Sequence, residues 1–184
     1  MEMSGERLGP EEWVRAGLRA LAESGFTALK ADTLAKTLGV SRGSFYWHFA
    51  DVGAFHAAVL QRWRKVALER IVAEIDKAPG DRLEALMQRA FADRSMIEAA
   101  VRAWAFADPD ARAAVEAVDA ERTRYLRNLL IEAGIVPALA ETRAQILNWT
   151  YLGHSLAARQ GDSDELRSII AILAQFAYAP SPAR

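Results

Sequence analysis

The stretch ADTLAKTLGVSRGSFYWHF, residues 31–49, has the pattern of two short helices joined by a tight turn. Leu34 and Leu38 lie four residues apart and place apolar side chains on one side of the first helix. Gly39 follows directly, where the end of a helix usually requires a left-handed backbone. Ser41 stands where the N-cap of the second helix is expected, and we expect its side chain to cap that helix. This spacing is typical of a helix-turn-helix unit.

The outward side of the second helix has the residue types that recognise DNA. Phe45 and Phe49 are predicted to face the first helix, so the remaining side chains point away from it. Arg42 lies in the first turn, and arginine is the usual bidentate partner of guanine. Hydroxyl and imidazole groups on the same side are suited to phosphate oxygens. The residues that are not needed for packing are Arg42, Gly43, Ser44, Tyr46, Trp47 and His48.

The alternative is an ordinary helical subdomain in which these aromatic residues only fill a core. Residues 46–49 are four consecutive aromatic or imidazole residues. One short helix cannot bury all of them, so some must face outward. The DNA-binding interpretation is therefore favoured.

Residues from about Pro10 to Arg70 resemble the DNA-binding domain of the tetracycline-repressor (TetR) family of bacterial transcription regulators. The motif LAKTLGVSRGSFYWHF carries the resemblance, together with the start of a long helix at Asp51. It implies an all-α fold of about nine helices. In this fold, residues 1–50 form a three-helix DNA-binding domain, and residues 51–184 form a domain for dimerisation and effector binding. A long helix over residues 51–76 would connect the two.

The resemblance also implies residue roles. Arg42, Gly43 and Tyr46 would approach bases, while Ser44, Tyr46 and His48 would approach phosphates and Trp47 would lie at the DNA-facing edge. Two positions depart from the family pattern, because Lys30 replaces a common threonine and Val52 replaces a common phosphate-binding lysine. Lys30 would supply the charge that is missing at Val52. The full predicted DNA-binding set is Lys30, Ser41, Arg42, Gly43, Ser44, Tyr46, Trp47 and His48.

Composition sets outer bounds on the function. The chain has 184 residues, 52% of them hydrophobic, no cysteine and a net charge of −1. It is long enough for a substantial core, and it has neither a thiolate metal site nor a disulfide. Residues 1–50 contain six basic and six acidic residues, but the acids cluster at Glu2, Glu6, Glu11, Glu12 and Glu23, away from the recognition helix. We expect a cytoplasmic protein with no membrane segment, no metal and no cofactor.

Turn and capping signals divide the chain into helices. Beyond residue 76, the segment KAPGD at residues 77–81 interrupts the helical pattern and is the predicted boundary between DNA reader and sensor. Asp51, Asp108 and Asp162 stand where helix N-caps are expected. The predicted helices are residues 10–24, 31–38, 42–48, 51–76, 82–92, 95–107, 109–133, 137–160, and one that begins after Asp162.

The last two long helices are predicted to form a homodimer interface. The helix over 137–160 is apolar on more than one side, which a single core would not require. Periodicity alone leaves open whether both helices merely complete the core of one subunit. The resemblance favours the dimer, because the family pairs its last two helices. The predicted interface residues are Ile146, Gly153, Leu156, Ala157, Ile169, Ile170, Leu173 and Phe176.

Large and polar residues on otherwise apolar helices indicate a pocket for an unknown apolar or aromatic effector. The alternative for each is an ordinary core position. The predicted pocket residues are Met87, Phe91, Met96, Trp104, Tyr125, Asn148, Trp149 and His154.

An enzyme is the less favoured class of function, because the sequence shows no paired histidines, nucleophile elbow or glycine-rich phosphate loop. An architectural DNA-binding protein without an effector is a further alternative. The sequence predicts a dimeric, effector-released repressor that binds a palindromic operator in double-stranded DNA.

Overall fold

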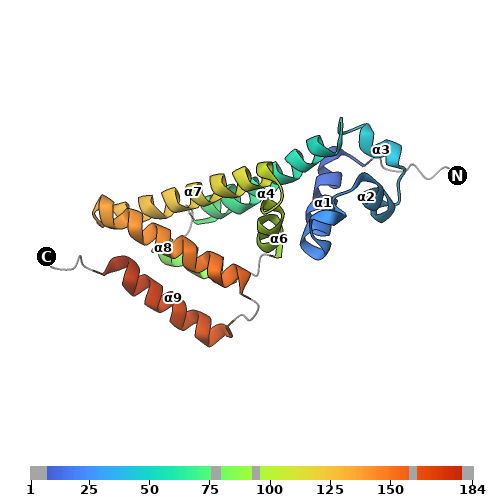
Figure 1. Cartoon of the computed structure of the whole chain (residues 1–184). Helices are drawn as coiled ribbons and strands as arrows, with labels where there is room; N and C mark the ends of the chain where they lie inside the picture. The colour runs from blue at the N-terminus through green and yellow to red at the C-terminus, as the bar shows by residue number, and fades with distance from the viewer. Residues whose placement is uncertain (1–7, 76–79, 93–95, 158–160, 180–184) are drawn as a thin grey trace. The chain divides into compact units, whose positions relative to one another are not determined.

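The computed structural model describes residues 8–75, 80–92, 96–157 and 161–179, and these residues contain nine α-helices, one 3-10 turn and no strand. The predicted all-α fold is confirmed. None of the helices in these ranges is both long and apolar enough to cross a membrane. The helices are α1 Pro10–Ser24, α2 Ala31–Leu38, α3 Arg42–Tyr46, α4 Val52–Ile75, α5 Arg82–Ala92, α6 Met96–Ala105, α7 Pro109–Glu132, α8 Pro137–Leu156 and α9 Ser163–Tyr178, with η1 at Phe26–Ala28 (Figure 1).

The chain forms two compact units, and two of its helices pass from one to the other. Unit 1 comprises residues 1–65 and 96–115, and unit 2 comprises residues 66–95 and 116–184. Unit 1 therefore contains α1, α2, α3 and α6, with the first parts of α4 and α7. The predicted division at residue 50, between a DNA-binding domain and a domain for dimerisation and effector binding, stays a prediction. Most of the predicted boundary at residues 77–81 lies outside the described residues.

An aromatic core fixes the first three helices of unit 1. Trp13 of α1 and Phe45 of α3 are fully buried, and their rings meet edge to face with centroids 5.3 Å apart. Phe55 of α4 lies 5.3 Å from Phe45. A Cβ atom added at Gly17 would come within 2.6 Å of the Phe55 ring, so only glycine allows α1 to approach α4 this closely. The short recognition helix is thus held by packing on its inner side.

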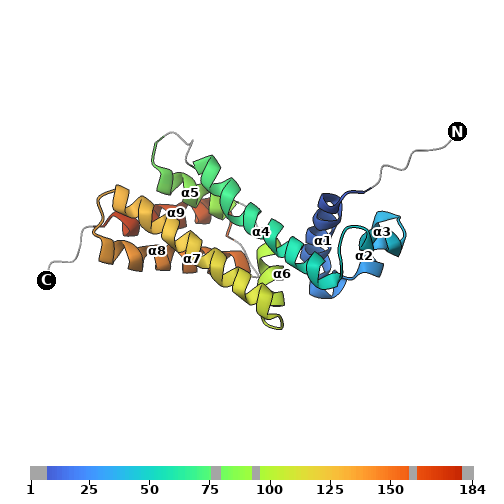
Figure 2. The same cartoon turned by 90° about the horizontal axis from the view of Figure 1, so that it is seen from above.

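Unit 2 is built around α5, α8 and α9, which pack against one another (Figure 2). Leu83 and Met87 of α5, Leu130 of α7 and Leu147 of α8 belong to one buried cluster. The Arg143 guanidinium is also buried and donates hydrogen bonds to the carbonyls of Ala177 and Ala179, at 2.7 and 2.6 Å. This contact fixes the C-terminal end of α9 on α8.

Candidate nucleic-acid interface and ligand cavity

The turn between α2 and α3 has the predicted geometry at its glycine but not at its serine. Gly39 has the left-handed conformation, with φ 69° and ψ 27°. Ser41 occupies the N-cap position, yet its side chain accepts no hydrogen bond from the helix, so the predicted side-chain cap is wrong. The Ser44 amide instead donates to the Ser41 carbonyl at 3.0 Å, a backbone turn that already satisfies a first-turn amide.

The predicted reading surface is accessible. Phe45 and Phe49 are buried, whereas Trp47 is 88% exposed and Tyr46 is 43% exposed. α3 ends at Tyr46, so Trp47 and His48 lie in a turn rather than in the predicted continuation of the helix. The other predicted DNA-binding residues Lys30, Ser41, Arg42, Gly43 and His48 are exposed, and Ser44 is half-buried.

Arg42 is held by two neighbours on this surface. Its Nε lies 3.3 Å from the Asp32 carboxylate, and its Nη2 donates to the Tyr46 hydroxyl at 3.2 Å. Its guanidinium also lies 5.5 Å from the centre of the Tyr46 ring. The hydrogen bond to Tyr46, followed by the charge of Asp32, raises the pKa of Arg42. Asp32 was not expected here, because it belongs to α2 and reaches Arg42 only through the crossing of two helices.

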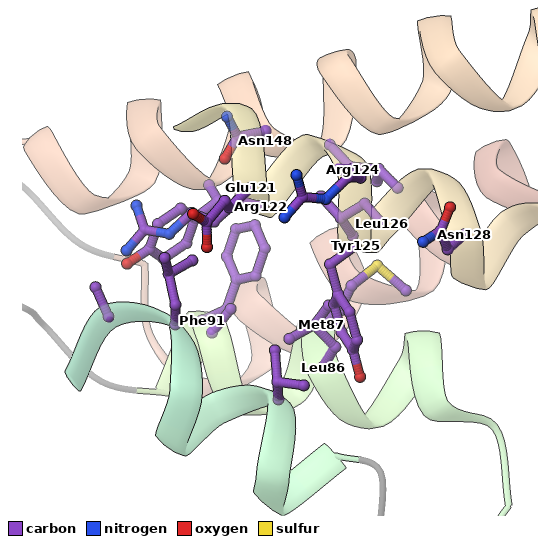
Figure 3. Close-up of a pocket in the computed structure, with 16 residues that line it drawn as sticks. Leu86, Met87, Phe91, Glu121, Arg122, Arg124, Tyr125, Leu126, Asn128 and Asn148 are labelled. Atoms are coloured by element: carbon purple, nitrogen blue, oxygen red, sulfur yellow. The ribbon is translucent and has the colours of Figure 1, made fainter. Parts of the chain in front are cut away.

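A cavity of about 290 Å³ lies within unit 2 and is the clearest candidate for a ligand site. Its apolar walls come from α4, α5 and α8, and charged residues of α7 line another side (Figure 3). Four of the predicted pocket residues, Met87, Phe91, Tyr125 and Asn148, line this cavity.

The other four predicted pocket residues lie elsewhere. Trp104 and Met96 belong to unit 1, where Trp104 is buried and stacks on Phe26 with centroids 4.8 Å apart. Trp149 is 63% exposed and lines a second, more polar hollow between α7 and α8. His154 packs on the cavity residue Phe91, with ring centroids 4.9 Å apart, but does not itself line the cavity.

Sequence reasoning missed the charged side of the cavity. Glu121, Arg122 and Arg124 line it from α7, and Tyr151 lines it from α8. Helical spacing could have found Tyr151, since it follows Leu147 by four residues. The α7 residues gave no such signal, because charges on a long helix usually face solvent. Among the described residues, no group of three or more acidic or imidazole side chains is arranged to hold a metal ion.

The predicted dimer residues lie on α8 and α9, apart from Ala157, which directly follows α8, and they are partly exposed in the single chain. Leu156 is 51% exposed, and a Cβ atom added at Gly153 would meet no atom within 4 Å. Ile170, Leu173 and Phe176 are half-buried against the core of their own unit, so they contribute to the subunit itself. The remaining positions, Ile146, Ala157 and Ile169, are exposed or half-buried.

Together these features define an all-helical protein with an N-terminal helix-turn-helix domain and a separate unit that contains a cavity. Residues 14–51 match the family model for bacterial regulatory proteins of the tetR family. The N-terminal segment is thus similar to the DNA-binding domain of tetR-family regulators.

Solved structures of similar fold cover nearly the whole chain. The reduced form of NemR from E. coli has a TM-score of 0.79 and 22% identity, over 94% of this chain and 99% of that one. A proposed transcriptional regulator from Saccharomonospora viridis, in complex with choline, has a TM-score of 0.71 and 16% identity, over 90% and 95% of the two chains. A transcriptional regulator from Rhodococcus has a TM-score of 0.71 and 23% identity, over 92% and 95%. No curated protein sequence matches the chain.

Proposed function

We propose that this protein is a repressor that binds a palindromic operator as a homodimer and is released from it by a small molecule. The observation that carries the proposal is the accessible surface of α3. Its inner phenylalanines are buried while Arg42, Tyr46 and Trp47 stay exposed. A single short helix reads few base pairs, so a two-fold dimer would double the recognised site. The protein would act in the bacterial cytoplasm, on the nucleoid when it is bound to DNA.

The exposed residues divide into two roles. Arg42 and Gly43 would meet base edges, and Tyr46 would meet both bases and phosphates. Ser44, His48 and Lys30 would position the protein on phosphates, and Trp47 would cover the edge of the contact. Phosphate contacts fix the register but do not read sequence. Loss of Arg42 should therefore change which sequences bind, whereas loss of a phosphate contact should weaken all of them alike.

The cavity in unit 2 would bind the effector. Its size and mixed lining are those of a small-molecule site. The neighbour from Saccharomonospora viridis holds choline, which supports small-molecule binding by proteins of this fold. An effector that lowers operator affinity must, by linkage, bind the DNA-bound protein more weakly to the same degree.

The test begins with selection of bound fragments from the source genome by the purified protein. Binding of the selected operator and of single-base variants is then measured for the wild type and for Arg42→Ala. We expect Arg42→Ala to weaken the free energy of operator binding by about 1–3 kcal/mol and to relax base preference at one position in each half-site. Arg19→Ala is the matched control, since Arg19 is exposed on α1 outside the predicted surface. Unchanged discrimination by Arg42→Ala would contradict the proposed reading role.

Dimerisation and release are tested separately. The selected fragments should contain inverted repeats, and the mass of the complex should correspond to two chains per operator. A screen of small molecules for loss of operator binding then separates a regulated repressor from an architectural DNA-binding protein. The latter would bind DNA with no compound able to release it.

A further inference from the structure

We infer that the cavity of unit 2 selects an aromatic ligand that bears one carboxylate, held by Asn148 and Arg124. The inference rests on the proposed effector role of this cavity and specifies the chemical class of the ligand. Both residues line the cavity, Asn148 from α8 and Arg124 from α7 (Figure 3).

The Asn148 amide lies at the wall of the cavity. The residue as a whole is only 2% exposed, so a partner for its amide must come from within the cavity. Buried amides are nearly always hydrogen-bonded, because an unpaired one loses its interaction with water and gains nothing in exchange. An amide in this position can donate from its NH₂ group to a ligand oxygen, and its own oxygen can accept from a ligand donor.

The charges around the cavity favour a negative ligand. Glu121 and Arg122 already interact with other residues of the chain. Arg124 also lines the cavity, but it has no acidic partner among the described residues. Figure 3 shows Arg122 and Arg124 on the α7 side, with Phe91 and Met87 of α5 across the cavity. The Arg124 guanidinium and the Asn148 amide can together donate hydrogen bonds to one carboxylate.

The aromatic surface argues against a cationic ligand. A ligand cation would bind over an aromatic face, and Phe91, Tyr125 and Tyr151 line the cavity. The Tyr151 ring already faces the Arg122 guanidinium, 5.1 Å from the ring centre, and the Phe91 ring packs on His154. A second cation at Tyr151 would lie beside the Arg122 guanidinium. The apolar walls, which include Leu86, Met87 and Phe91, would instead contact the uncharged ring of the ligand.

Three probes with one ring system separate these possibilities. 2-Naphthoate carries the carboxylate, 2-acetylnaphthalene carries a neutral carbonyl, and trimethyl(2-naphthyl)ammonium carries a cation. Binding to the full-length protein without DNA is measured by calorimetry and by quenching of tryptophan fluorescence. We expect 2-naphthoate to bind best, the ketone about tenfold more weakly, as for the loss of one charge-assisted interaction, and the cation weakest. Equal binding of all three, preference for the cation, or binding of none would overturn the inference.

Variants then assign the contacts. Asn148→Leu should weaken both oxygen-bearing probes about tenfold, and Asn148→Asp should weaken 2-naphthoate more than the ketone. Gln175→Glu is the control for added charge, because Gln175 is exposed on α9 and does not line the cavity. Arg124→Gln should weaken only 2-naphthoate. Arg127→Gln is its control, since Arg127 lies on the same helix and pairs with Glu141.

The selectivity of the wild type for the three probes tests the inference even if an Asn148 variant fails to fold. Operator release is measured afterwards with the same probes. If 2-naphthoate binds in the cavity but leaves the operator bound, the ligand class stands and the proposed effector role fails. If only a cationic compound releases the operator, the effector role stands and the ligand class is overturned.

Discussion

Asp32 places a negative charge beside the residue that we expect to read bases. Its carboxylate lies 3.3 Å from Arg42, and both side chains are largely exposed. An exposed ion pair of this kind adds little to folding stability. We expect a larger effect on DNA binding, because the carboxylate would compete with DNA for the guanidinium and would repel nearby phosphates. Asp32 should therefore reduce the affinity of the predicted reading surface.

Replacement of Asp32 by asparagine should tighten operator binding several-fold at low salt. The variant should also steepen the dependence of log affinity on log salt by up to about one unit, the change expected for about one added phosphate contact. Fluorescence anisotropy across a salt series measures both quantities. Asp110→Asn is a matched control, since Asp110 is exposed at the start of α7 outside the predicted surface. Weaker binding by Asp32→Asn would show instead that Asp32 positions Arg42.

Asp81 joins the start of α5 to the end of α9. Its carboxylate accepts hydrogen bonds from the amides of Leu83 and Glu84 and from the Tyr178 hydroxyl, at 2.9, 3.1 and 2.7 Å. Burial acts to raise the pKa of Asp81, but these hydrogen bonds together outweigh it and lower that pKa. Burial and the bond to Asp81 raise the pKa of Tyr178.

A lowered carboxyl pKa makes the contribution of this contact depend on pH. The stabilisation is fully present above the ordinary aspartate pKa of about 3.9 and is lost as the pH falls through the lowered value. Tyr178→Phe should therefore cost about 1 kcal/mol at pH 7, discounted for the partial exposure of the pair. The difference in free energy of unfolding between this variant and the wild type should shrink below about pH 3. Urea unfolding at several pH values measures it, and a constant difference from pH 7 to pH 2 would contradict this account.

Single residues were predictable where their partner is close in sequence. The carboxylates of Asp51, Asp108 and Asp162 each accept a hydrogen bond from an amide two or three residues later, as N-caps should. The predicted side-chain cap at Ser41 was wrong because the backbone carbonyl of Ser41 accepts the hydrogen bond from the helix instead of its side chain. Asp32 was missed because its partner lies on another helix, and such contacts leave no periodic signal in the sequence.

The C-terminal end of α9 depends on one buried arginine. Arg143 of α8 donates to the carbonyls of Ala177 and Ala179, and its guanidinium lies 5.8 Å from the centre of the Phe176 ring. The last carbonyls of a helix have no partner inside the helix, so Arg143 supplies one.

Arg143→Met keeps much of the side-chain volume but removes both donors. It should lower the free energy of unfolding by about 2–3 kcal/mol, because buried carbonyls lose a charged partner. Urea unfolding followed by circular dichroism measures the loss. Arg167→Ala on the exposed face of α9 should change stability by less than about 0.5 kcal/mol. Similar small losses for both variants would show that the end of α9 is held by apolar packing alone.

Most helix boundaries followed from local chemistry. Pro10, Pro109 and Pro137 each stand at the first position of a helix, as predicted. α3 and α8 are shorter than predicted, ending at Tyr46 and Leu156. Neither end has a glycine or proline at the next residue, so the sequence contains no local stop signal there. The part of the predicted α8 at residues 158–160 lies outside the described residues.

The class of fold was predictable from the sequence, and the division at residue 50 stays a prediction. Residues 96–115 follow the predicted reading domain by many residues, yet they belong to the same compact unit. Trp104 explains why, since its ring stacks on Phe26 of η1. Trp104 and Met96 belong to unit 1, whereas Trp149 and His154 lie in unit 2 but do not line its cavity, so only half of the predicted pocket residues share one cavity. Residue type suggested a pocket, but the packing of α4, α5, α7 and α8 decides which side chains meet.

The homodimer is also a prediction, and Gly153 offers a direct test of it. The residue is exposed on α8, and an added Cβ atom would meet nothing within 4 Å in the single chain. Gly153→Leu should therefore preserve the fold, and better helix propensity should even stabilise the subunit by up to about 1 kcal/mol. If α8 crosses its partner closely at this glycine, the leucine would cost about 1–3 kcal/mol of dimer stability.

Sedimentation velocity over a range of concentrations, with thermal unfolding of each variant, separates the two effects. We expect Gly153→Leu to move the monomer–dimer midpoint to higher concentration and to weaken binding to a two-half-site operator. Binding of one chain to an isolated half-site should stay unchanged, because the reading surface lies on another unit. Ala113→Leu is the matched control, since it adds a similar side chain at an exposed position of α7. A Gly153→Leu protein that dimerises like the wild type would place the dimer contact elsewhere on the chain.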